Sequence, residues 1–229
     1  MAGAGPWLLI GNSRWHWAEG PSHDRRNWSE PPQQALPHCP ERWAAVGPPP
    51  AGLDPNARIG LAQIPLASAP AWLGVDRALA GWQAWQRSAG PVLVADAGTA
   101  LSLTWIDHDG HVAGGRLLAG AALQLRALHA GTQALPLLEP PPSAEGSDQG
   151  WPLQTEAAMA VGVFDGLAGA LQRAAEGLAQ QQPGLQLWLT GGDGERLHRL
   201  LEPYSGLAQR WTLAPGLCLD GVAAAAALS

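Results

Sequence analysis

The two halves of this chain begin with the same pattern of short elements. In the first half, an apolar run at residues 7–10 is followed by a polar turn with a glycine and by alternating residues at 14–18. In the second half, an apolar run at 92–95 is followed by a similar turn and by alternating residues at 101–106. Each pattern predicts a strand, a tight turn and a second strand. The repetition indicates an internal duplication, which constrains the fold to two related parts.

Helices are predicted between and after these strands. Apolar residues recur at helical spacing within residues 71–88. In the second half, Thr155 can cap a long helix, and a strand and shorter helices follow it. The chain is therefore predicted to be α/β, with one domain at residues 1–89 and a second at residues 90–229.

The absence of lysine excludes several kinds of phosphate chemistry. All thirteen basic residues are arginine, and the chain has no lysine. A Walker-type lysine, a protein-kinase lysine and a Schiff-base lysine are therefore all excluded. The net charge of −6 also makes a nucleic-acid partner unexpected. Any phosphate chemistry here must depend on backbone N–H groups, arginine and metal ions.

The spacing of the cysteines and the lengths of the apolar stretches indicate the compartment in which the protein is expected. Cys39 and Cys218 form no C-x-x-C pair, which indicates reduced thiols and no thiolate metal site. No apolar stretch is long enough to cross a bilayer, so no membrane association is expected. The segment from Met1 to Pro6 has no signal-peptide pattern. A cytoplasmic location is therefore predicted.

One polar turn in the second half has groups suited to phosphate and metal. Gly98 lets the backbone approach an anion closely, and Thr99 offers both a hydroxyl and an N–H group. Asp96, at the end of a predicted strand, can hold a cation that neutralises phosphate charge. We expect Gly98 and Thr99 to bind the nucleotide and Asp96 to bind the metal.

Two further turns offer backbone N–H groups. The segment Gly11-Asn12-Ser13-Arg14 follows the first predicted strand and could bind nucleotide phosphate in the same way. Gly191 and Gly192 follow a later strand and precede a helix, where N–H groups point toward an anion. Each turn by itself is more often a plain hairpin or strand–helix connection. Together, in this order, they indicate a nucleotide site.

A short segment before the helix at 71–88 supplies a candidate base. In Gly74-Val75-Asp76-Arg77, an aspartate lies next to an arginine at the start of a helix. Such a pair is commonly a surface cap and ion pair worth ~0.5 kcal/mol. Alternatively, Asp76 acts as a general base on a substrate hydroxyl, and Arg77 contacts an anionic group of the substrate.

Opposed glycine turns in a two-part α/β chain are the arrangement of actin, hexokinase and the 70-kDa chaperones. The fold class expected is therefore an actin-like ATPase fold, with two duplicated ribonuclease H-like domains and a nucleotide cleft between them.

In this order the motifs resemble those of type III pantothenate kinases over essentially the whole chain. Residues 10–13 are similar to the end of the phosphate motif D-x-G-N-T, residues 74–77 match the substrate motif G-x-D-R, and residues 96–100 match D-x-G-T-A. Weaker matches lie at Gly114-Gly115 with Gly120, Thr132 with Leu135-Pro136, Thr155 with Gly162, and Thr190-Gly191-Gly192-Asp193.

The resemblance implies an activity and its site. Asp76 would take the proton from the primary hydroxyl of pantothenate, which would attack the γ-phosphate of ATP to give 4′-phosphopantothenate, the first step of coenzyme A biosynthesis. Gly74, Val75, Asp76, Arg77 and Thr155 would bind pantothenate, with Thr155 reaching it from the partner of a homodimer. ATP, Mg²⁺ and a monovalent cation, K⁺ or NH₄⁺, would be required.

Three departures from the family pattern keep alternatives open. Leu9 stands where the first phosphate motif has an aspartate, and a leucine cannot bind Mg²⁺ or its waters. Ala119 replaces a proline, and residues 67–70 lack the tyrosine that relatives often have there. A non-catalytic relative of the Bvg accessory factor type is therefore an alternative. Another kinase or phosphatase of the same fold is a third possibility, because fold alone does not fix the substrate.

Overall fold

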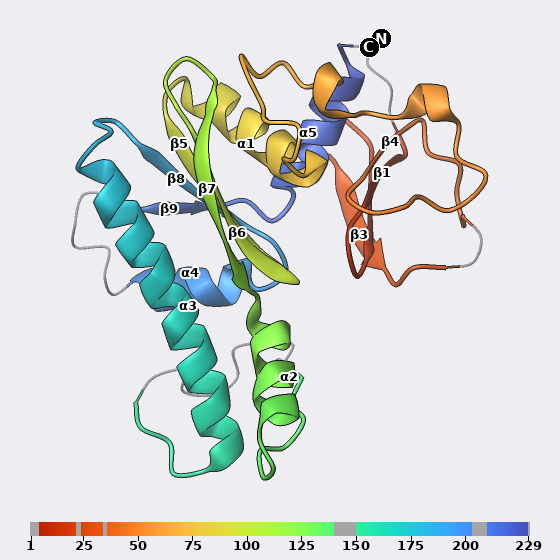
Figure 1. Cartoon of the computed structure of the whole chain (residues 1–229). Helices are drawn as coiled ribbons and strands as arrows, with labels where there is room; N and C mark the ends of the chain where they lie inside the picture. Colours follow the sequence, from red (N-terminus) through yellow and green to blue (C-terminus); the bar gives the residue numbers. More distant parts are fainter. Residues whose placement is uncertain (1–4, 22–23, 34–35, 140–149, 203–209, 229) are drawn as a thin grey trace. The chain divides into compact units, whose positions relative to one another are not determined.

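The computed structural model describes residues 5–21, 24–33, 36–139, 150–202 and 210–228 (Figure 1). The chain divides into two compact units. The first unit comprises residues 1–92, 104–114 and 216–229, and the second comprises 93–103 and 115–215. The predicted domains, 1–89 and 90–229, differ from these units because 104–114 and the C-terminal segment group with the first unit. The domain boundary near residue 90 stays a prediction.

The first unit contains a four-stranded sheet with the order β3-β2-β1-β4. Strands β1 (Trp7–Ile10) and β2 (Trp15–Glu19) form an antiparallel hairpin, which the alternating sequence predicts. Strand β3 (Arg26–Glu30), which was not predicted, pairs with β2, and β4 (Arg42–Ala45) runs parallel to β1.

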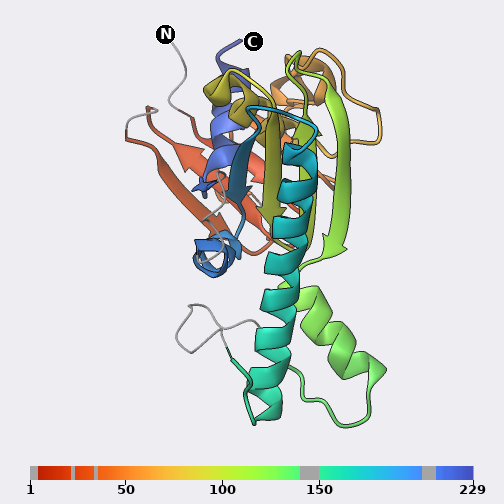
Figure 2. The ribbon, with the colours of Figure 1, turned by 90° about the vertical axis from the view of Figure 1, so that its left-hand side faces the viewer.

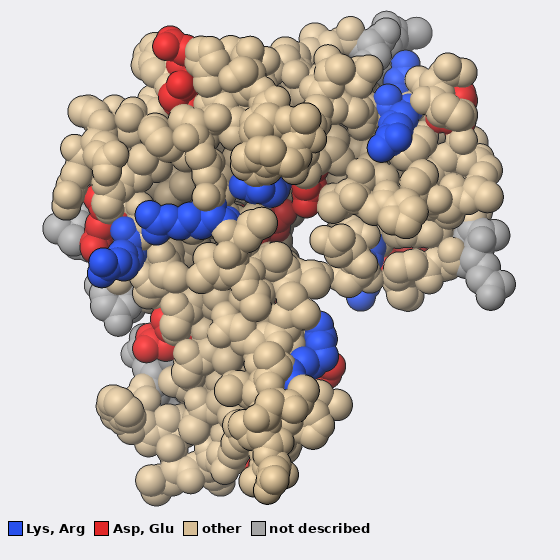
Figure 3. All heavy atoms as spheres, in the orientation of Figure 1, with Lys and Arg blue, Asp and Glu red and all other residues tan. Residues whose placement is uncertain are grey.

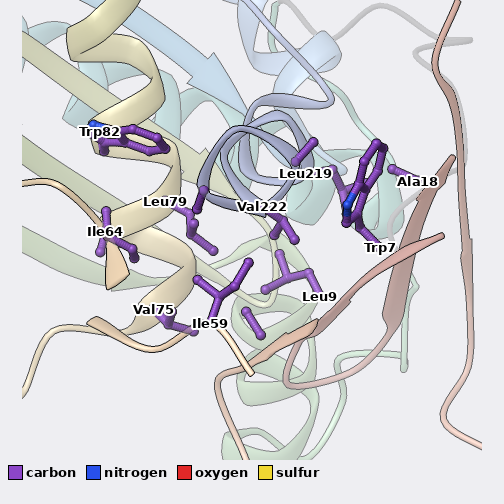
Figure 4. Close-up of a cluster of buried hydrophobic side chains, with 14 of the residues drawn as sticks. Trp7, Leu9, Ala18, Ile59, Ile64, Val75, Leu79, Trp82, Leu219 and Val222 are labelled. Carbon is purple, nitrogen blue, oxygen red and sulfur yellow. The ribbon is translucent and has the colours of Figure 1, made fainter. Parts of the chain in front are cut away.

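One face of this sheet packs against two helices, α1 (Val75–Ser88) and α5 (Leu217–Ala226). Trp7 and Leu9 of β1 belong to a buried cluster with Leu219 and Val222 of α5. Figure 4 shows Leu9 and Val222 pointing toward one another within it. Because side chains alternate along a strand, Leu8 and Ile10 belong to a different cluster.

Tryptophans pack that second cluster. Trp15, Trp17 and Trp43 are buried with Leu8 and Ile10, and Trp28 of β3 packs at the edge. The rings of Trp17 and Trp28 stack with centroids 6.0 Å apart and planes 7° apart. Two short 3₁₀ helices, η1 (Pro55–Ala57) and η2 (Leu61–Gln63), lie in the segment that follows β4. The tryptophans of β2, β3 and β4 therefore supply much of the hydrophobic area of this cluster.

The second sheet has the strand order β7-β6-β5-β8-β9. Its strands are β5 (Val92–Ala97), β6 (Ala100–Ile106), β7 (Val112–Ala119), β8 (Gln186–Thr190) and β9 (Trp211–Leu213). The helices of the second unit are α2 (Ala121–Gly131), α3 (Thr155–Ala179) and α4 (Gly194–Leu201). Helices α2 and α3 contact one another, and together they extend beyond the strands β8 and β9 (Figure 2).

The apolar residues Met159, Val163, Leu167 and Leu171 of α3 are buried, as their four-residue spacing predicts. The expected cap of this helix is wrong by one residue, because Gln154 occupies the N-cap and Thr155 is the first helical residue. Within the described ranges, no helix combines the length and the apolar character that crossing a membrane requires.

Candidate functional site

Two turns of the second unit meet at Asp96. Strand β5 continues to Ala97, so Asp96 is its penultimate residue and is half-buried. A tight turn follows, in which the N–H group of Gly98 donates to the carbonyl of Ala100 at 3.1 Å. The N–H group of Asp193 donates to the carbonyl of Ala97 at 2.9 Å. The predicted nucleotide turns at 96–99 and 190–194 therefore lie against each other.

Glycine is required at position 191 for this close approach. Gly191 has a φ of +91°, in the left-handed region that other residues rarely adopt. A Cβ at this position would lie 2.4 Å from the carbonyl oxygen of Ala97 and 2.5 Å from Oδ1 of Asp96. Gly192 is exposed beside it. The structure thus brings Gly191 against Asp96, and Gly192 is the next residue of the turn.

A third glycine, Gly120, closes the same turn from another direction. Its N–H group donates to the carbonyl of Thr99 at 3.1 Å. A Cβ on Gly120 would lie 2.0 Å from the carbonyl oxygen of Gly98 and 2.7 Å from that of Thr99. The sequence contained a signal for this residue, a glycine immediately before α2, but gave no indication of its contact with Gly98.

A helix N-terminus and two carboxylates, Asp96 and Asp193, determine the charge at these turns. Helix α4 begins at Gly194, so its first N–H groups lie beside Gly192. Burial raises the pKa of Asp193, against the opposing effect of the Arg196 charge. Among the described residues, no group of three or more His, Cys, Asp or Glu side chains could hold a metal. A single carboxylate such as Asp96 still suits Mg²⁺, which keeps several waters and binds substrate phosphates.

The corresponding loop of the first unit is more open. The N–H group of Gly11 donates to the carbonyl of Arg14 at 2.9 Å, which closes the loop between β1 and β2. Asn12, Ser13 and Arg14 are exposed. The guanidinium of Arg14 donates to the hydroxyl of Ser29 at 3.1 Å and to its carbonyl at 3.0 Å. The Arg14 side chain is therefore bound to β3.

Position 9 belongs to the core. Leu9 is only 5% exposed and lies in the apolar cluster with Ile59 and Val222. The first unit therefore presents no carboxylate at the place where the phosphate motif has an aspartate.

Asp76 lies in the first turn of α1, two residues after the N-cap Gly74. Its Oδ1 atom is buried and has no hydrogen-bond partner among the described residues. Burial raises the pKa of Asp76, while the backbone N–H and the charge of Arg77 act in the opposite direction. A Cβ on Gly74 would lie 2.5 Å from Oδ1, so the glycine leaves room for the carboxylate. A partly desolvated carboxylate with a raised pKa is suited to accept a proton.

Arg77 is held next to this carboxylate. It is 8% exposed, and its Nε donates to the hydroxyl of Thr104 at 3.0 Å. Its guanidinium carbon lies 5.9 Å from the ring centroid of Trp72, which is 70% exposed. Gly74, Val75, Asp76 and Arg77 thus form one local group in the first unit. Thr155 lies in the second unit and is exposed at the start of α3.

Arginine does not form one continuous patch on the face shown in Figure 3. Lys and Arg spheres, here all arginine, occur in separate groups, several of them beside red Asp and Glu spheres. Nucleic-acid-binding faces have clustered basic residues. The absence of a nucleic-acid partner stays a prediction.

Known proteins resemble this chain in sequence and in structure. The family model for type III pantothenate kinase matches residues 51–177. A type III pantothenate kinase from Synechococcus elongatus is 35% identical over 94% of this chain and 93% of its own length. Another, from Thermosynechococcus vestitus, is 37% identical over 89% of this chain and 83% of its own length.

A solved structure from Campylobacter jejuni, described as a conserved Baf family transcriptional activator, aligns with this chain. It has a TM-score of 0.65 and 20% identity and covers 96% of both chains. At this identity the likeness concerns the fold alone, and the fold is the actin-like ATPase fold expected from the sequence. Relatives at 35% and 37% identity, together with the family model, establish that this chain belongs to the type III pantothenate kinase family.

Proposed function

We propose that this chain phosphorylates pantothenate with ATP to give 4′-phosphopantothenate and ADP, the first step of coenzyme A biosynthesis. Membership of the type III pantothenate kinase family supports the substrate. The observation that carries the mechanism is the carboxylate of Asp76, whose Oδ1 is buried without a hydrogen-bond partner in the described chain.

In the proposed step, a carboxylate oxygen of Asp76 accepts the proton of the primary hydroxyl of pantothenate. The hydroxyl oxygen forms a bond to the γ-phosphorus of ATP while the bond to the bridging oxygen of ADP breaks. The raised pKa of Asp76 makes it a better proton acceptor near neutral pH than an ordinary aspartate. Arg77 would orient an anionic group of the substrate.

The glycine turns would bind the triphosphate through backbone N–H groups. These are the turns at Gly98-Thr99 and Gly191-Gly192 in the second unit and at 11–14 in the first. Such groups stabilise negative charge without rearranging during the reaction. Asp96 would hold Mg²⁺, which would neutralise charge on the phosphoryl oxygens.

The remaining requirements depend on the family resemblance alone. A monovalent cation, K⁺ or NH₄⁺, would assist binding of the phosphates. The active form would be a homodimer in which Thr155 contacts the pantothenate of the partner. The reaction would take place in the cytoplasm.

The test is phosphorylation of pantothenate by the purified protein. ATP and Mg²⁺ are supplied with K⁺, with NH₄⁺ or with neither, and 4′-phosphopantothenate is measured by mass spectrometry. Product that depends on the monovalent cation supports the proposal. Absence of product under every condition, from folded protein, would favour a non-catalytic relative. Leu9, in place of the aspartate of the phosphate motif, is the sequence feature that supports this alternative. Turnover with another alcohol but not with pantothenate would indicate a different small-molecule kinase.

A further inference from the structure

A histidine lies beside the loop of the first unit and has no role in the mechanism above. His16 is the second residue of β2, and it is paired with Leu9 of β1 in the antiparallel register. Side chains alternate along β2, so that Trp15 and Trp17 lie in one cluster and Ala18 in the other, with Leu9. His16 is therefore the polar residue on the face of Leu9, at the end of the strand next to the loop.

The imidazole of His16 lies against Gly11. A Cβ added to Gly11 would be 3.5 Å from Nε2 and 3.6 Å from Cδ2 of His16. The ring is half-buried and forms no hydrogen bond with any described residue. Since an imidazole has a donor and an acceptor nitrogen, such a ring can bind a ligand without breaking a bond within the protein.

Leu9, which lies opposite His16 across the hairpin, cannot be a hydrogen-bond partner of the ring. Side chains directly opposite on antiparallel strands have Cβ atoms about 4.5–5.5 Å apart. A carboxylate at position 9 would therefore be within reach of the His16 ring, whereas leucine cannot accept a hydrogen bond. The second unit has the reverse arrangement, because its turn retains the carboxylate of Asp96.

The basic side chain of the loop itself, Arg14, is bound elsewhere. The chain has no lysine, and the guanidinium of Arg14 is bound to Ser29 of β3. Burial lowers the pKa of His16, and the nearby charge of Arg14 lowers it further. The ring is accordingly neutral near pH 7, and it retains one N–H group that can donate to an anion.

We propose that His16 donates a hydrogen bond to a phosphate oxygen of the nucleotide bound at the loop 11–14. This inference depends on the proposed function, since it requires that the loop bind the polyphosphate of ATP. In this chain a neutral hydrogen-bond donor, His16, thus lies opposite position 9, where the family motif has a metal-binding carboxylate. His16 would contribute to the affinity for phosphates and not to the recognition of adenosine.

The test compares the binding of two ligands by isothermal titration calorimetry. The ligands are a non-hydrolysable ATP analogue, in the presence of Mg²⁺, and adenosine. His16→Leu is expected to bind the analogue about tenfold more weakly, as for the loss of one hydrogen bond to a charged group. Its affinity for adenosine should be unchanged. His16→Gln keeps an N–H donor and should recover part of the loss, and His108→Gln, in an exposed turn, is the matched control.

The outcomes distinguish failure of the proposed function from failure of the role of His16. Wild-type protein that binds no ATP analogue would overturn both the proposed function and the role of His16. Equal affinity of wild type and His16→Leu for the analogue would overturn only the role of His16. An equal loss of affinity for adenosine would indicate a merely structural role and would also overturn it.

An NMR measurement on the wild-type protein tests the same contact even if the variants do not fold. In protein with ¹⁵N-labelled histidine, inorganic triphosphate with Mg²⁺ should shift the imidazole Nε2 resonance that His16→Gln lacks. If His16→Gln does not fold, the resonance is assigned by sequential NMR of the wild type. No shift at saturating triphosphate would overturn the proposal.

Discussion

The loop at 11–14 and the turn at 96–99 follow the same strand–turn–strand pattern but differ in what surrounds them. Around Gly98, the backbones of Gly120 and Gly191 approach so closely that a Cβ on either would overlap a carbonyl oxygen. Around Gly11, the next residues are exposed and the nearest carbonyl, that of Arg14, leaves more space. The pattern supplies backbone N–H groups in both places, but long-range packing decides how rigidly they are held.

The units also differ in their acidic groups. The second unit retains Asp96 at its turn, whereas the first has Leu9 at the equivalent place and a buried carboxylate at Asp76 on α1. Under the proposed function, the carboxylate that would hold Mg²⁺ belongs to the second unit, and the carboxylate that would act as the base belongs to the first. Changes to each unit should therefore affect different measurements.

The largest effect is expected for Asp76→Asn. The amide cannot accept the proton, so kcat should fall by about 10³-fold or more, while the affinity for the ATP analogue stays unchanged. Steady-state kinetics together with calorimetry separate the two quantities. Unchanged turnover in this variant would reject Asp76 as the base.

The same variant has a stability signature with a defined sign. Because the pKa of Asp76 is raised in the folded protein, ionisation of Asp76 favours the unfolded state. Wild type should lose stability as pH rises from the ordinary aspartate pKa through the raised one, and Asp76→Asn should not. At pH 7 the variant should therefore have the higher Tm, and the gap should narrow toward acidic pH. A variant less stable than wild type at pH 7 would contradict the raised pKa.

The next effect compares two glycine-to-alanine changes. Neither Gly11 nor Gly120 has a positive φ, so backbone strain does not separate them. A Cβ at 120 would be 2.0 Å from a carbonyl oxygen, against 3.0 Å at 11. We expect Gly120→Ala to lower the free energy of unfolding by about 3 kcal/mol and Gly11→Ala by about 1 kcal/mol or less. Urea denaturation measures both, and equal losses would show that the two turns are held with similar rigidity.

Sequence patterns located the turns because their signals are local. The hairpin of β1 and β2 follows from period-two alternation around a glycine turn. Strand β3 lay in a stretch rich in Pro and polar residues, and its pairing with β2 was not predicted. The C-terminal helix begins at Leu217 and includes Gly221, a residue type that is unfavourable inside a helix. In the structure, a Cβ on Gly221 would be 2.6 Å from the carbonyl oxygen of Leu79, so close packing of α1 and α5 requires glycine.

The candidate site was predicted as a set of motifs, but not as a set of contacts. Asp96 and Gly191 are far apart in sequence, and only the folded sheet brings Gly191 against Ala97 and Asp96. The Oδ1 atom of Asp76 is buried without a hydrogen-bond partner among the described residues, and this too depends on tertiary packing. His16 was overlooked because a lone histidine in a strand carries no motif, and its significance depends on Leu9 across the hairpin.

A second pair of variants contrasts positions 9 and 96. Asp96→Asn should lower kcat by about 100-fold through weaker stabilisation of phosphate charge. Its Tm should change little, because the side chain is half-buried and the substitution keeps its volume. Leu9→Ala should instead cost about 3 kcal/mol of stability, as for a buried leucine, with kcat unchanged at a temperature where the protein is folded. A large loss of kcat in Leu9→Ala would mean that position 9 still has a catalytic role.

The smallest effect is expected for Arg14→Ala, and it tests how open the first loop is. The guanidinium of Arg14 is bound to Ser29, and the side chain is exposed, so its removal should change stability by about 0.5 kcal/mol or less. The affinity for the ATP analogue should change less than about threefold, because backbone N–H groups and His16 would remain. An affinity loss of tenfold would show that Arg14 leaves Ser29 to bind phosphate. The first loop would then bind phosphate through a charged side chain, whereas the second turn holds its N–H groups by glycine packing.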